Sequence, residues 1–127
     1  MTTSKARLTA LITPVEQEAQ NEAKALSQGG RVSRAVSRLR KDSGLGLRTG
    51  SAALDLLNEG SSLPTSYQQA LNALRSLSPD LVDEMSALLD NEDSTSAIKL
   101  LRERTDMDLA GGYHLVQELS GRPDTAA

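Results

Sequence analysis

The chain has 127 residues, a net charge of −3 and no cysteine, so we expect one domain without disulfides, zinc thiolates or thiol catalysis. Its apolar residues are mostly leucine (21) and alanine (15), with seven valines and isoleucines and neither phenylalanine nor tryptophan. Leucine and alanine favour helices, whereas strands favour the residue types that are scarce here. The composition therefore predicts an all-α protein.

An amino-terminal helical segment is expected over residues 1–30. Residues 4–12 carry a brief apolar run, and residues 14–28 are helix-prone up to Gly30. The first residues lack a small-residue cleavage site, and no stretch approaches the roughly 18 apolar residues needed to cross a bilayer. We therefore expect a cytoplasmic protein that does not enter a membrane.

The next predicted helix, residues 32–42, has the strongest charge pattern in the chain. Its apolar side is expected to carry Val32, Val36 and Leu39. Basic residues recur at spacings of three and four along its other side, and we call them the basic stripe: Arg31, Arg34, Arg38 and Lys41. Such a stripe is typical of a surface that binds phosphates or an acidic protein face, and equally of a solvated helix exterior. A third alternative is a contact with the acidic stretch at residues 80–93.

Residues 35–60 and 97–121 align without a gap at a spacing of 62. Identical pairs are Ala35 and Ala97, Leu39 and Leu101, Arg40 and Arg102, Leu47 and Leu109, and Gly50 and Gly112. In each copy, two helical apolar patterns flank a polar turn, which predicts a helix-turn-helix hairpin. We expect six to seven short helices built from two ~62-residue repeats.

The two turns differ in sequence. Gly44 is suited to the left-handed conformation that ends a helix. Asp106 replaces it in the second copy at a higher conformational cost, and Asp108 is placed to cap the next helix. In the first copy the apolar face of the second helix is expected to include Leu47 and Leu54.

Helices at residues 64–77 and 79–90 are predicted to join the two hairpins within a core that spans residues 31–121. The first of these should turn a face that includes Leu77 toward the core. A polar connector over residues 91–96 follows, and the tail at residues 122–127 is expected to be disordered.

Catalytic and metal-binding signatures are absent from the sequence. Gly44, Gly46 and Gly50 have a spacing seen in dinucleotide-binding loops, but that fingerprint requires a preceding strand. His114 is the only histidine and has no partner ligand, so a half-exposed helix position is expected. We predict a protein that is not an enzyme and that uses no cofactor or metal.

A DNA-reading helix-turn-helix would need basic or polar side chains on the second helix of the hairpin. The basic residues lie mainly on the first helix, and the aromatic side chains that stack on single strands are scarce. Binding to a nucleic-acid backbone through the basic stripe stays open, whereas base reading is disfavoured.

The segments RLRKDSGLGL (residues 38–47) and LLRERTDMDL (residues 100–109) resemble the helix hairpin of the bacterial ribosomal stalk protein's carboxy-terminal domain. They are also similar to the ubiquitin-associated-like amino-terminal module of elongation factor Ts. In both families the hairpin docks on translation GTPases, which is the function that the resemblance implies. Lys99 and Arg102, with Arg40 in the first copy, fall on the stalk domain's basic contact positions. The stalk domain's strands have no counterpart here.

The leading hypothesis is a bacterial helical protein-interaction module that docks on a translation factor or ribosomal component. One alternative is a nucleic-acid-binding regulator that uses the helix at residues 31–41; another is an immunity or antitoxin-like inhibitor. Homo-oligomerisation stays open, as does whether both hairpins bind. The predicted partner-binding residues are Arg31, Arg34, Arg38, Arg40, Lys41, Arg48, Lys99 and Arg102.

Overall fold

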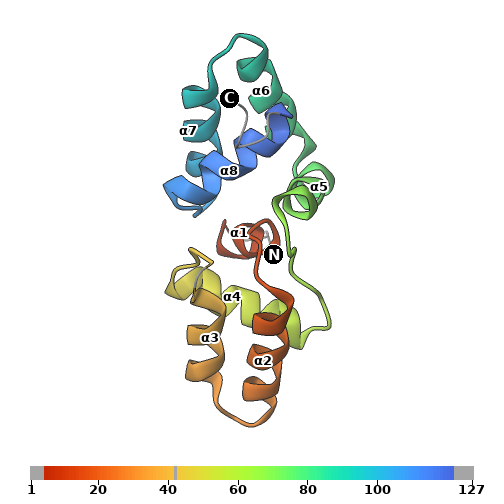
Figure 1. The fold of residues 1–127 in the computed structure, drawn as a ribbon, viewed down its shortest axis with the longest axis vertical. Coiled ribbons are helices and arrows are strands. Elements are labelled where there is room, and N and C mark those ends of the chain that lie inside the picture. Colours follow the sequence, from red (N-terminus) through yellow and green to blue (C-terminus); the bar gives the residue numbers. More distant parts are fainter. Residues whose placement is uncertain (1–4, 42, 122–127) are drawn as a thin grey trace.

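A computed structural model describes residues 5–41 and 43–121, which form eight helices (Figure 1). The helices are α1 (Lys5–Leu11), α2 (Gln17–Gln28), α3 (Val32–Arg40), α4 (Leu47–Asn58), α5 (Tyr67–Leu77), α6 (Pro79–Asp90), α7 (Ser94–Arg104) and α8 (Leu109–Ser120). The all-α prediction is confirmed, with eight helices in the described residues instead of six to seven.

Capping residues determine where the helices of the second half begin. Ser66 precedes α5 and accepts a hydrogen bond from a backbone amide in the first turn, and Pro79 is the first residue of α6. The sequence predicted a connector over residues 91–96, but α7 already begins at Ser94. The reason is Asp93, whose side chain accepts a hydrogen bond from an amide of the first turn of α7.

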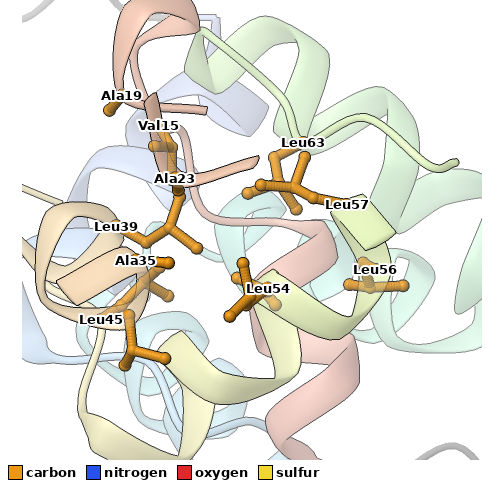
Figure 2. Close-up of a cluster of buried hydrophobic side chains, with 13 residues drawn as sticks. Val15, Ala19, Ala23, Ala35, Leu39, Leu45, Leu54, Leu56, Leu57 and Leu63 are labelled. Carbon is orange, nitrogen blue, oxygen red and sulfur yellow. The ribbon is translucent and has the colours of Figure 1, made fainter. Parts of the chain in front are cut away.

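One cluster of buried side chains lies between α2, α3 and α4 (Figure 2). Alanines on the facing sides of these helices let the backbones approach, and leucines fill the remaining space. Val15, Leu45 and Leu63 reach the cluster from the connecting segments. Its most buried helical members are Ala10 of α1 together with Ala23, Ala35, Leu39 and Ala53.

A second cluster lies between α5, α6, α7 and α8. Its largest fully buried helical side chains are Leu74, Leu81, Met85, Leu101 and Leu115. Ile12, which directly follows α1, also belongs to this cluster and is fully buried. The amino-terminal segment therefore contributes to the core of the second half.

Helix α1 lies between the two halves of the elongated molecule and packs against both α4 and α5 (Figure 1). Thr9 Oγ1 accepts a hydrogen bond from the amide of Asp106 at 2.7 Å. Lys5 Nζ donates to the carbonyl of Glu103 at 3.0 Å. These contacts join α1 to the turn of the second hairpin.

A buried glutamine fastens α2 to the segment that precedes α5. Gln20 is 2% exposed, and its Nε2 donates to the carbonyls of Val15 (2.8 Å) and Leu63 (3.0 Å). Its Oε1 accepts from the Leu63 amide at 3.0 Å. The position 62 residues later is Val82, so this connection belongs to the first half alone.

Corresponding helices begin 62 residues apart in the two halves: Lys5 and Tyr67, Gln17 and Pro79, Val32 and Ser94, and Leu47 and Leu109. The same helix pairs also pack in both halves, with α2, α3 and α4 arranged as α6, α7 and α8. A duplicated unit of four helices would produce this register, and the repeat stays a prediction.

Two predicted core residues, Val32 and Leu77, are instead 53% and 50% exposed. Val32 is the first residue of α3 and Leu77 is the last of α5. Both residues continue the apolar stripe of their helix, but at the helix end no neighbouring helix covers enough of the side chain to bury it.

None of the helices in the described residues has the length and apolar character required to span a bilayer. The predicted disordered tail at residues 122–127 lies outside the described residues, as does Asp42, the predicted end of the basic helix. The division of the chain at residue 30 stays a prediction.

Candidate functional site

The two hairpins close with the same hydrogen bond. Ser43 Oγ donates to the carbonyl of Leu39 at 2.6 Å, and Thr105 Oγ1 donates to that of Leu101 at 2.7 Å. In each hairpin the same hydroxyl also accepts from the amide two residues later, at 3.3 Å. A hydroxyl at this position therefore ends the first helix and fixes the turn in both hairpins.

Predictions for the turn residues are partly confirmed. Gly44 is left-handed at φ +79°, and Asp108 caps α8 by accepting a hydrogen bond from the amide of Gly111 at 2.7 Å. Asp106 was expected to carry a conformational cost, but its φ is not positive. Its amide bonds to Thr9 instead, so the second turn takes a different course without left-handed strain.

Each hairpin exposes a leucine at the first residue of its second helix. Leu47 is 67% exposed and Leu109 is 60% exposed. The sequence placed Leu47 on the core side, but the buried face of α4 begins two residues later, at Thr49. Solvent-facing leucines at equivalent positions are candidates for contact with a partner.

In each hairpin an arginine of the first helix packs on a glycine of the second helix. A Cβ at Gly50 would stand 2.8 Å from Arg40 Cγ, and one at Gly112 would stand 3.3 Å from Arg102 Cγ. The two arginine stems therefore pack on the second helix about one turn past the exposed leucine. Arg102 and Leu109 also line one groove, whereas Arg40 Nε donates to the carbonyl of Leu45 at 3.4 Å. Neither arginine forms a salt bridge within the described residues.

A groove of about 740 Å³ follows α7 and the turn into α8. Its apolar lining comes from Ile98, Met107 and Leu109. The predicted contact residues Lys99 and Arg102 both line it and are exposed. The structure thus brings these two site residues together with an exposed leucine.

The basic stripe lies against acidic residues of α2. Arg38 Nε donates to Glu22 Oε2 at 2.8 Å. This hydrogen bond raises the pKa of Arg38 and lowers that of Glu22, and the nearby charges of Glu18 and Glu16 raise the Arg38 pKa further. The pair is consequently ionised at neutral pH, so part of the stripe is already neutralised.

The acidic stretch at residues 80–93 does not lie across from the stripe, contrary to one expectation. It belongs mainly to α6, at the far end of the molecule from α3 (Figure 1). Glu84 of this stretch pairs instead with Arg104 of α7, at 3.3 Å. The sequence contains several acidic segments, and charge alone did not identify which one meets the stripe.

The remaining predicted site residues are exposed but are spread over the first half. Arg31 and Arg34 lie at the start of α3, Lys41 directly follows α3, and Arg48 is the second residue of α4. Lys41 and Arg38 line a smaller cavity of about 260 Å³ near Tyr67. The structure therefore brings together Lys99 with Arg102 and Arg38 with Lys41, and does not gather the other predicted site residues.

Sequence reasoning missed an aromatic cluster on α5 and α8. The ring of His114 lies 5.3 Å from that of Tyr67 and 5.4 Å from that of Tyr113, between centroids. These are both tyrosines and the only histidine of the chain. His114 is half-buried, as expected, and the described residues contain no group of side chains suited to hold a metal ion.

Comparison of the chain with protein-family models found no match, and comparisons with curated proteins and with solved structures found none either.

Replacing Gly44 with alanine is expected to destabilise the protein by about 2 kcal/mol. Alanine at this position would be strained by the left-handed backbone conformation. Its Cβ would also stand 2.7 Å from Asp108 Oδ2 and would disturb the side chain that caps α8. Gly60→Ala is the control, because Gly60 is also left-handed but faces open space, and it should lose about 1 kcal/mol. Urea unfolding measures the free energy of unfolding of both variants. Equal losses in the two variants would contradict a contribution from the contact with Asp108.

Proposed function

We propose that this protein is a non-enzymatic, cytoplasmic helical module that docks through its hairpins on another protein, such as a translation factor or ribosomal component. The observation that carries the proposal is that each hairpin has an exposed leucine about one helical turn from an arginine that forms no salt bridge within the described residues. An apolar anchor beside a cation is a common combination at the centre of protein interfaces. The resemblance of both turns to stalk and elongation-factor hairpins supports the same class of partner.

The pairing of Arg38 with Glu22 favours a protein partner over a nucleic acid. A phosphate backbone is bound by cations whose charge is available, and affinity grows with the number of phosphates neutralised. Glu22 and Glu18 of α2 and Glu16 directly before it raise the pKa of Arg38, and a polyanion would be repelled by the same carboxylates.

Affinity capture from a bacterial lysate, with nuclease treatment, tests the proposal. The wild-type chain should retain a protein in stoichiometric amount, and Leu47→Ser combined with Leu109→Ser should reduce that amount at least about tenfold. Leu77→Ser is the matched control, because Leu77 is similarly exposed but lies outside the hairpins. Circular dichroism confirms that each variant is folded.

Three outcomes would count against this function. Recovery of no stoichiometric protein, or equal recovery with the double variant, would exclude docking through the hairpin leucines. Recovery that disappears on nuclease treatment would favour the nucleic-acid alternative.

A further inference from the structure

The two halves meet through equivalent positions. Lys5 at the start of α1 donates to the carbonyl of Glu103 near the end of α7, in the other half. Tyr67 and Lys41 are their counterparts, each at a spacing of 62, and they line one cavity together. The start of α1 thus contacts the second hairpin, and the start of α5 faces the same cavity as the end of the first helix of the first hairpin.

Equivalent elements also meet each other directly. Helix α1 packs against α5, its counterpart in the second half. The two turns touch as well, because a Cβ at Gly44 would stand 2.7 Å from Asp108 Oδ2. Reciprocal contacts of this kind characterise the two-fold interface of a closed dimer, whereas a solenoid passes contacts on in one direction.

We infer that an approximate two-fold axis relates the halves, and that the hairpins form one surface for two identical segments of a homodimeric partner. The starts of α4 and α8, which carry Leu47 and Leu109, lie at the same edge of the molecule, at the left in Figure 1. Identical recognition elements related by a two-fold axis match a ligand of the same symmetry. This inference rests on the proposed function.

The chemistry of each half-site defines the segment. Leu47 and Leu109 supply the apolar contact, and Arg40 and Arg102 supply a cation beside it. The complementary segment is an amphipathic helix with an apolar side chain and a carboxylate one turn away. Two linked segments that bind together gain affinity without new contacts, typically by about 10²- to 10⁴-fold.

The test uses a helical peptide about 14 residues long, with leucines on one face and glutamates one turn away, and a dimer of it joined by a flexible linker. Amide NMR of the full chain should show the single peptide shifting resonances of both turns. The linked peptide should bind as one dimer per chain, at least about 100-fold more tightly. Leu47→Ala or Leu109→Ala alone should remove that gain and leave the other hairpin responsive.

The outcomes separate this inference from the function on which it rests. Resonance shifts at one hairpin only, or equal affinity of the single and the linked peptide, would contradict a two-fold binding surface. Docking through a single hairpin would remain compatible with either result. Absence of binding by either peptide at millimolar concentration, or equal binding of a peptide with lysines in place of the glutamates, would contradict the proposed recognition itself. A short oligonucleotide that shifts the same resonances to the same extent as the peptide would also contradict the proposed recognition.

Discussion

The Gln20→Leu variant should lose about 3–4 kcal/mol of unfolding free energy, because three backbone groups would lose their partner inside the core. The Gln20 side chain is buried and forms hydrogen bonds with the carbonyl of Val15 and with the carbonyl and the amide of Leu63. Urea unfolding followed by circular dichroism measures the loss. Hydrogen exchange should also show faster opening at the Leu63 amide.

Gln28→Leu is the matched control for this prediction. Gln28 lies on the same helix but is exposed, so its replacement should change the unfolding free energy by no more than about 0.5 kcal/mol. A Gln20 variant as stable as this control would show that the buried hydrogen bonds contribute nothing.

Truncation of either central hairpin leucine, by Leu39→Ala or Leu101→Ala, should cost about 2–5 kcal/mol. Both side chains are fully buried, and each lies at the same position of its own cluster. Because α1 packs against both halves, either substitution should lower one common unfolding transition. Calorimetry and urea unfolding test this.

The exposed leucines at the start of the second helix of each hairpin provide the control. Leu47→Ala and Leu109→Ala should change the unfolding free energy by less than about 0.5 kcal/mol. Two separate transitions, with Leu39→Ala affecting only one of them, would show that the halves unfold independently.

Much of the local structure followed from the sequence because single residues determine it. Pro79 begins α6 at the predicted residue, Asp108 caps α8, and Gly44 takes the expected left-handed conformation. In each case the cause lies within a few residues of the effect. These features were therefore predictable without knowledge of tertiary contacts, whereas the course of the second turn was not, because the Asp106 amide bonds to Thr9, 97 residues away.

The composition of the candidate surface was less predictable, because it depends on which helices meet. Helical periodicity assigned Leu47 to the core, yet nothing covers the first turn of α4 at that residue. Charge counting identified the basic stripe but not Glu22 as its partner. The sequence did not distinguish Gln20 from the other polar residues of α2. Its hydrogen-bond partner Leu63 lies 43 residues away, so local sequence gives no sign that Gln20 is buried.

The position of α1 limits how the chain can be divided. A fragment that begins at residue 64, between α4 and α5, would lack Ile12 from its interior and the Thr9 hydroxyl that accepts from the Asp106 amide. The complementary fragment would leave the α5 side of α1 in water. We therefore expect neither piece to fold on its own, so that the smallest stable unit contains both four-helix halves.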